Sequence, residues 1–141
     1  MKLRKISVIK PVLVLLVIAM TCIVAAAQPL LPPCPSSPNC VSSLAPDSHF
    51  IEPLRFSGDA VAAFARLQTI LASRSDTRII AATGTTLQVE FRTLLGFVDD
   101  GLLVLDASAG VIHLRSAARL GYWDLGKNRS RMEEIRQQFL P

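Results

Sequence analysis

The sequence predicts a single α+β domain made of one helix, a four-stranded antiparallel sheet and a C-terminal helix. Three observations support this fold class. A helical pattern spans residues 57–71, strand patterns follow between residues 79 and 116, and a second helical pattern spans residues 126–139. About 114 residues follow Ala27, which suits one domain with one hydrophobic core. We therefore expect no second domain, and place the α+β domain at residues 49–141.

The N-terminus has the features of an export signal. Four basic residues precede an apolar run over residues 12–24, and three alanines then supply a cleavage site before Gln28. We expect residues 1–27 to be a signal peptide. Residues 11–31 would alternatively serve as an uncleaved anchor, since a bilayer span needs roughly 20 apolar residues. Both interpretations predict an exported protein of the periplasm or cell envelope, and the second adds membrane association through the N-terminus.

Removal of the signal changes the charge balance. The full chain has 15 Lys and Arg against 11 Asp and Glu, but four of the cations lie in residues 1–27. The remaining 11 cations balance the 11 acids. A neutral domain lacks the positive field that nucleic-acid binding requires, so no nucleic acid is expected as a partner.

Residues 28–48 are rich in Pro and Ser, which predicts an extended surface arm outside the sheet. The arm contains Cys34 and Cys40, the only cysteines that follow the signal. An even number in an oxidising compartment favours a disulfide. In so short a loop it would fix a turn rather than hold the fold, with a modest stabilisation of about 2 kcal/mol. Redox exchange and metal binding are the alternatives. A redox pair is normally Cys-x-x-Cys and a zinc site needs two further ligands, so no metal or cofactor is expected.

The predicted elements follow in order from hydrophobic periodicity. Helix 57–71 begins with capping residues and places Ala60, Phe64, Leu67 and Leu71 on one face. A short strand at 79–82 and a turn at 83–85 precede a strand at 87–92, in which apolar and polar residues alternate. Residues 98–106 and 111–116 predict two further strands joined by a turn at 107–110. Asp99 and Asp100 with Gly101 are also expected to start a turn.

The final helix is expected from about Gly126 to Phe139. Met132, Ile135 and Phe139 share one stripe, whereas Arg131 points away from it. Asn128 falls within the stripe, where it needs partners. It is the N-cap if the helix starts there.

The segment 115–131 supplies the candidate site, because it concentrates arginines, glycines and both large amphipathic aromatics. Alternation places His113 and Arg115 on the sheet face that Glu90 and Arg92 share, so two polar rows could meet. Arginine forks and backbone amides suit a carboxylate or phosphate. We therefore expect Arg115 and Arg129 to face a common pocket that holds an anion near a helix N-terminus. The candidate ligand-binding residues are Arg115, Ser116, Arg119, Tyr122, Asp124, Asn128 and Arg129.

The alternative for this segment is a solvated sheet face whose arginines pair with Glu90, Asp99, Asp100 and Asp124. Tyr122 and Trp123 could stack on a sugar or a base or lie at a lipid headgroup surface, although such a pair is more often a packing anchor. No catalytic residue is assigned. Asp99 and Asp100 point to opposite faces if they lie in a strand, and no serine occupies a Gly-x-Ser-x-Gly elbow.

Five blocks of sequence resemble the domain of unknown function 1499 family, from Cys34 to the C-terminus. They are residues 34–43, 49–54, 97–100, 112–116 and 119–129, the last reading Arg-Leu-Gly-Tyr-Trp-Asp-Leu-Gly-Lys-Asn-Arg. The resemblance implies a small exported, membrane-associated or organellar protein without an established activity. It also implies that residues 115–129 are a family signature, in which Ala118 replaces an expected serine.

The sequence therefore predicts an exported, non-enzymatic binding module of the cell envelope, whose partner is a small anion or an envelope component. One alternative is a small hydrolase or isomerase that uses His113 or Asp100 as base, with Arg115 and Arg119 holding an anion. The other is a purely structural envelope protein.

Overall fold

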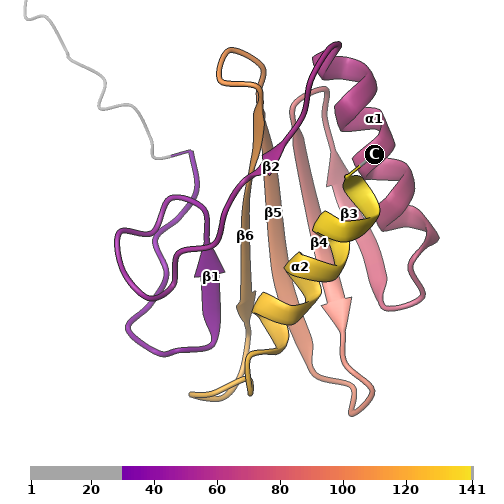
Figure 1. Ribbon diagram of the computed structural model, residues 1–141. Coiled ribbons are helices and arrows are strands. Elements are labelled where there is room, and N and C mark those ends of the chain that lie inside the picture. Colours follow the sequence, from indigo (N-terminus) through magenta and orange to yellow (C-terminus); the bar gives the residue numbers. More distant parts are fainter. Residues whose placement is uncertain (1–29, 141) are drawn as a thin grey trace, which may run out of the picture.

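The computed structural model describes residues 30–140, so the expected signal peptide, and nearly all of the alternative anchor, lie outside the described residues. The described chain forms a six-stranded sheet and two helices (Figure 1). Their bounds are β1 Cys40–Ser42, β2 Leu54–Arg55, α1 Ala60–Ser73, β3 Thr77–Ala82, β4 Thr86–Arg92, β5 Val98–Asp106, β6 Val111–Ala118 and α2 Lys127–Phe139.

The sheet is antiparallel throughout and has the strand order β1-β6-β5-β4-β3, with β2 also paired to β6. The four longer strands, β3 to β6, form the meander that the sequence predicts. The expected total of four strands is wrong, because β1 and β2 add two short strands along the free edge of β6. β2 has only two residues, which is too short to produce a periodic signal.

β1 also corrects the prediction for the arm. Residues 28–48 were expected to lie outside the sheet, yet Cys40 to Ser42 pair with residues 115–117 of β6 and are buried. The prolines end at Pro38 in this part of the arm, and Val41 then joins the hydrophobic core. Proline content therefore describes the loops on either side of β1 but not the strand itself.

Both helices cover one face of the sheet, which leaves the other face open (Figure 1). The core between them includes Phe64 and Leu67 from α1, Met132 and Ile135 from α2, and inward side chains from β4 to β6. No helix within residues 30–140 has the length and hydropathy that a membrane crossing requires.

Local signals explain the ends of both helices. Asp59 is the N-cap of α1, and its carboxylate accepts from the backbone N–H of Ala62. Gly126, in a left-handed conformation, is the N-cap of α2, so Asn128 lies inside the helix rather than capping it. The sequence predicted the two helical segments within a few residues.

Gly101 lies within β5, so the turn expected at Asp99-Asp100-Gly101 is wrong. A Cβ atom at position 101 would come 2.5 Å from side-chain carbons of Val89 and Phe91. The glycine thus makes room for two core side chains on the neighbouring strand. Because the strand continues, Asp99 and Asp100 lie on opposite faces of the sheet.

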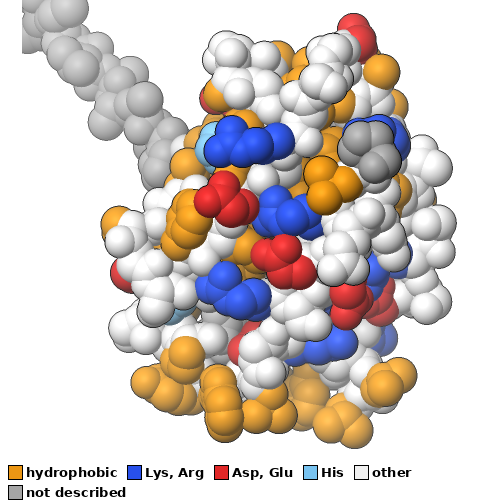
Figure 2. Space-filling view, in the orientation of Figure 1, with side chains coloured by type: hydrophobic (Ala, Val, Ile, Leu, Met, Phe, Trp, Pro, Cys, Tyr) orange, Lys and Arg blue, Asp and Glu red, His pale blue; other side chains and the backbone are white. Residues whose placement is uncertain are grey.

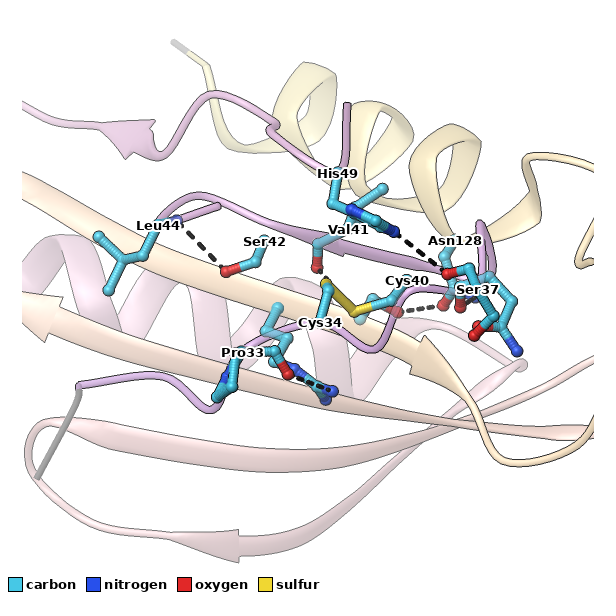
Figure 3. Close-up of a disulfide and its surroundings, with 12 residues drawn as sticks. Pro33, Cys34, Ser37, Cys40, Val41, Ser42, Leu44, His49 and Asn128 are labelled. Atoms are coloured by element: carbon cyan, nitrogen blue, oxygen red, sulfur yellow. Dashed lines mark hydrogen bonds between the residues drawn. A yellow bond between two sulfur atoms is a disulfide. The ribbon is translucent and has the colours of Figure 1, made fainter. Parts of the chain in front are cut away.

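The Cys34–Cys40 disulfide is present, as expected, with a Cα–Cα distance of 5.7 Å (Figure 3). It closes a short loop and attaches the arm to the start of β1. Leu31, before this loop, and Asn39, within it, are both buried, so the arm packs against the domain around the disulfide.

Candidate functional site

The sheet divides the predicted site residues between its two faces. Arg115 and Arg119 belong to the open face, where they line a pocket with residues of β4 and β5. Ser116 faces the helices and bonds to Asn128 of α2. One concave site that holds all of these residues is therefore not present.

Ser116, Asp124 and Asn128 form a hydrogen-bonded group at the start of α2. The Asn128 amide oxygen accepts from the Ser116 hydroxyl at 2.5 Å, and its Nδ2 donates to Asp124 at 2.8 Å and to the Asn39 carbonyl at 3.2 Å. The Asp124 carboxylate also accepts from the backbone N–H groups of Gly126 and Asn128. An internal carboxylate thus occupies the place at the helix N-terminus where an external anion was expected.

Arg131 continues this group into the core. Its side chain is 1% exposed and donates to Asp99 at 2.8 Å, and the guanidinium lies 4.7 Å from the centre of the Phe91 ring. The expectation that Arg131 points away from the apolar stripe is wrong. The contacts with Asp99 and Phe91, and a longer one of 3.8 Å from Nε to Asp76, offset part of its desolvation, while Nε and Nη2 have no hydrogen-bond partner within the described residues. Because its charge is paired inside the fold, Arg131 is a structural member of the core.

Arg129 lies in a second depression, of about 180 Å³, which we call the helix-end pocket. Its guanidinium donates to the carbonyls of Ser48 and Phe50 at 3.0 and 2.9 Å. The expectation that Arg115 and Arg129 share a pocket is therefore wrong, because Arg115 lines the depression on the opposite face of the sheet. The helix-end pocket is lined by Pro38, Cys40, Val41, Ser48, His49, Asp124, Gly126 and Arg129.

The larger depression, of about 290 Å³, lies on the open face, and we call it the open-face pocket. Side chains from three neighbouring strands meet there because Gln88, Leu102 and Arg115 are aligned across β4, β5 and β6. The next aligned row contains Glu90 and Asp100. The lining residues are Ile80, Gln88, Val89, Glu90, Asp100, Gly101, Leu102, Arg115 and Arg119.

Arg119 is held by carboxylates within the open-face pocket. Its guanidinium lies 2.7 Å from Asp100 and 2.6 Å from Glu90, and these hydrogen bonds raise the pKa of Arg119 above its ordinary value. The two polar rows predicted on β4 and β6 do share a face, although β5 separates them. Arg119 fits the interpretation of a solvated face with paired charges.

Arg115 has different surroundings. Its Nη2 donates to the Pro33 carbonyl at 3.3 Å, and its buried Nε has no hydrogen-bond partner within the described residues. Burial lowers the pKa of Arg115, and attraction from Asp100 only partly opposes this. No salt bridge joins Arg115 to a carboxylate in residues 30–140. Its charge is thus the least compensated in the open-face pocket.

The two candidate bases of the enzymatic alternative are engaged elsewhere. Asp100 is bound to Arg119. His113 does not line the open-face pocket, and its Nδ1 lies 3.0 Å from the Ser43 hydroxyl, which itself accepts from the backbone N–H of Leu114. Within residues 30–140, no group of three or more His, Cys, Asp or Glu side chains is arranged to hold a metal ion.

Tyr122 and Trp123 lie in the loop between β6 and α2, where their exposed fractions are 73% and 67%. They are therefore not packing anchors, which was the more common role for such a pair.

Sequence reasoning missed the buried pair of Asp99 and Arg131. Alternation along β5 contained the signal, because Asp99 shares a face with Gly101 and Leu103 and an inward carboxylate needs a cation. The assumed turn at Gly101 hid that alternation. Ile80 and Leu102, which line the open-face pocket, were also missed, because strand order rather than sequence brings them to Arg115.

Comparison with known proteins places this chain in a family. Neither the curated proteins nor the solved structures include a significant match. A family model described as "Protein of unknown function (DUF1499)" matches residues 30–139, which is almost the whole described chain. The resemblance noted in the sequence blocks is thereby confirmed. The chain belongs to the DUF1499 family of proteins of unknown function.

Proposed function

We propose that this protein is a non-enzymatic binding module of the cell envelope that holds a small anion in the open-face pocket. One observation carries the proposal: Arg115 keeps a half-buried guanidinium beside the pocket without a carboxylate partner in the described chain. Desolvating a cation costs free energy that a structural ion pair would normally offset. A bound carboxylate or phosphate would supply the missing partner.

The other walls of the pocket restrict the ligand. The volume of about 290 Å³ is at the lower end of ligand sites, which favours a small molecule. Ile80 and Leu102 offer apolar contact, whereas Glu90 and Asp100 present carboxylate oxygens beside Arg119. These features favour a monoanion with an apolar part, while a dianion would be repelled by the two carboxylates.

Binding is favoured over hydrolysis by the state of the nearby bases. A general base must reach a substrate proton, but Asp100 is held by Arg119 and His113 lies outside the pocket lining. The same arrangement supports a rigid recognition site, because Arg119 fixes the positions of both carboxylates.

Thermal unfolding of the full chain with inorganic phosphate or butyrate tests this proposal. A ligand at 100 times its dissociation constant stabilises the folded state by about 2.7 kcal/mol, so the midpoint should rise with butyrate, and less with inorganic phosphate, which is partly a dianion at neutral pH. Arg115→Leu should abolish that rise. Arg55→Leu is the matched control, since Arg55 lies in β2, its side chain is 73% exposed, and it should keep the full response.

Two results would contradict the proposal. The first is a wild-type midpoint that neither probe changes. The second is an equal rise in Arg115→Leu, which would place the bound anion elsewhere on the protein.

A further inference from the structure

Two loops at one end of the sheet concentrate the exposed apolar side chains of the domain. The β4–β5 loop, residues 93–97, and the β6–α2 loop, residues 119–126, emerge side by side, because Asp99 pairs with Ala118 and the Arg119 N–H donates to the Val98 carbonyl. Figure 2 shows hydrophobic side chains along the lower edge, where Figure 1 places both loops. We call this cluster the apolar tip: Leu94, Leu95, Phe97, Leu120, Tyr122, Trp123 and Leu125.

The apolar tip contains seven of the thirteen large apolar side chains that are exposed in residues 30–140. Leu94 and Leu95 are the extreme cases, with exposed fractions of 107% and 84%. Scattered apolar residues on a surface need no explanation, but a contiguous group marks an interaction surface. The apolar tip is such a group.

Hydrogen bonds within the β4–β5 loop fix the backbone on both sides of Leu94 and Leu95. Thr93 donates its N–H to the Phe97 carbonyl at 2.9 Å, Gly96 donates to the Thr93 carbonyl, and the Thr93 hydroxyl accepts from the Phe97 N–H at 3.0 Å. Polar backbone groups that are bonded within the loop lower the cost of transfer into an apolar environment. The N–H groups of Thr93, Gly96 and Phe97 are therefore already paired when Leu94 and Leu95 leave water.

The β6–α2 loop contains a strained residue, Leu125, in a tight turn that the Lys127 N–H closes on the Asp124 carbonyl at 3.0 Å. Leu125 has a φ of 56°, the only positive φ of a non-glycine residue in the described chain, and its side chain is 78% exposed. This backbone state costs free energy in a non-glycine residue, and here it directs an apolar side chain into solvent. Burial of Leu125 against a partner would offset that cost.

Charge and composition identify the partner. Arg92 and Lys127 flank the two loops, are exposed, and form no salt bridge within residues 30–140. The only acid in either loop, Asp124, has its carboxylate bonded to N–H groups of α2 and Asn128. Tyr and Trp concentrate where membrane headgroups meet acyl chains, and nearby cations attract anionic lipids.

We propose that the apolar tip docks on the surface of an anionic phospholipid bilayer. Leu94, Leu95 and Leu125 enter the boundary between headgroups and acyl chains, Tyr122 and Trp123 lie at headgroup level, and Arg92 and Lys127 contact lipid phosphates. This contact is separate from any N-terminal anchor and does not depend on a ligand in the open-face pocket.

Trp123 is the only tryptophan of the chain, so its fluorescence reports on the apolar tip in the full-length protein. With vesicles of phosphatidylcholine and phosphatidylglycerol, we expect a blue shift of the emission and quenching by lipids with brominated acyl chains. Leu94→Ser with Leu95→Ser should remove most of the quenching. Val61→Ser is the matched control, because Val61 is 71% exposed on α1 and should leave the quenching unchanged.

Unchanged Trp123 emission with these vesicles would overturn the proposal. A blue shift that appears without lipid and grows with protein concentration would also overturn it, because a second copy of the chain would then cover the apolar tip. Equal quenching in pure phosphatidylcholine vesicles would overturn the part assigned to Arg92 and Lys127.

Discussion

Arg131 and Arg115 lie on opposite sides of the same sheet, and their surroundings differ. Arg131 is a buried residue of α2 and donates to the carboxylate of Asp99, whereas Arg115 is half-buried on the open face and donates only to a backbone carbonyl. The first charge is paired with a carboxylate within the fold, and the second has no carboxylate partner within residues 30–140. An arginine that is paired with a carboxylate inside the fold is thus a structural residue, whereas one without such a partner is a candidate binding residue.

Loss of Arg131 should have the largest effect on stability. Arg131→Met would leave Asp99, whose side chain is 4% exposed, as an unpaired buried carboxylate. We expect the free energy of unfolding in urea to fall by about 3–5 kcal/mol.

The double variant Arg131→Met with Asp99→Leu provides the control for this loss. It removes both charges and should recover most of the stability, because a buried ion pair contributes little beyond what apolar replacements of similar volume supply. A double variant as unstable as Arg131→Met would show that the pair matters for a reason other than charge.

A smaller loss of stability is expected from a substitution at Gly101, on the helix-covered face of the sheet. Gly101→Ala places a Cβ atom 2.5 Å from carbons of Val89 and Phe91, so we expect a loss of about 1–3 kcal/mol. Gly84→Ala is the matched control, because a methyl group at position 84 would meet no atom within 4 Å and the φ of Gly84 is not positive. Equal unfolding free energies for the two variants would contradict close packing at Gly101.

Much of the fold could be predicted from the sequence, because hydrophobic periodicity and helix capping depend on residues that are close together in the chain. The helix capped by Asp59 and the alternating strand of Leu87, Val89 and Phe91 have strong local signals. β1 was missed because the surrounding prolines dominate the composition of the arm. Its pairing with β6 connects residues about 75 positions apart, such as Val41 and Ser116, which no local pattern reports.

The candidate site could be predicted only in part. Alternation correctly placed Glu90 and Arg115 on one face, but it could not show that β5 lies between their strands or that Arg119 would bind Glu90. The helical wheel failed at Arg131 because an apolar stripe gives no sign of a buried charge pair. Such a pair becomes visible only when Asp99 is known to face the helix.

A pH-dependent effect is expected at His49, beside the helix-end pocket. Its Nδ1 lies 2.7 Å from Asp47. Its Nε2 lies 3.1 Å from the Ser37 carbonyl (Figure 3). Both neighbours only accept hydrogen bonds, so the imidazolium form satisfies both. The hydrogen bond to Asp47 accordingly raises the pKa of His49 above its ordinary value.

A raised pKa in the folded state means that this stabilisation is present below the unfolded pKa of about 6.5 and is lost as pH rises through the folded value. His49→Gln should therefore destabilise the protein at about pH 6, by less than about 1 kcal/mol because Asp47 is 57% exposed. Urea unfolding at about pH 6 and pH 8.5 measures the difference between wild type and variant. A difference that grows toward high pH would contradict the charged form.

The most direct test of the contrast between the two arginines is the free energy of unfolding of Arg115→Leu without added ligand. Removal of a half-buried cation that has no carboxylate partner relieves desolvation and costs one hydrogen bond to Pro33. We therefore expect a change within about 1 kcal/mol of wild type. A loss of about 3–5 kcal/mol would contradict this account, because it would show that Arg115 belongs to a structural ion-pair network.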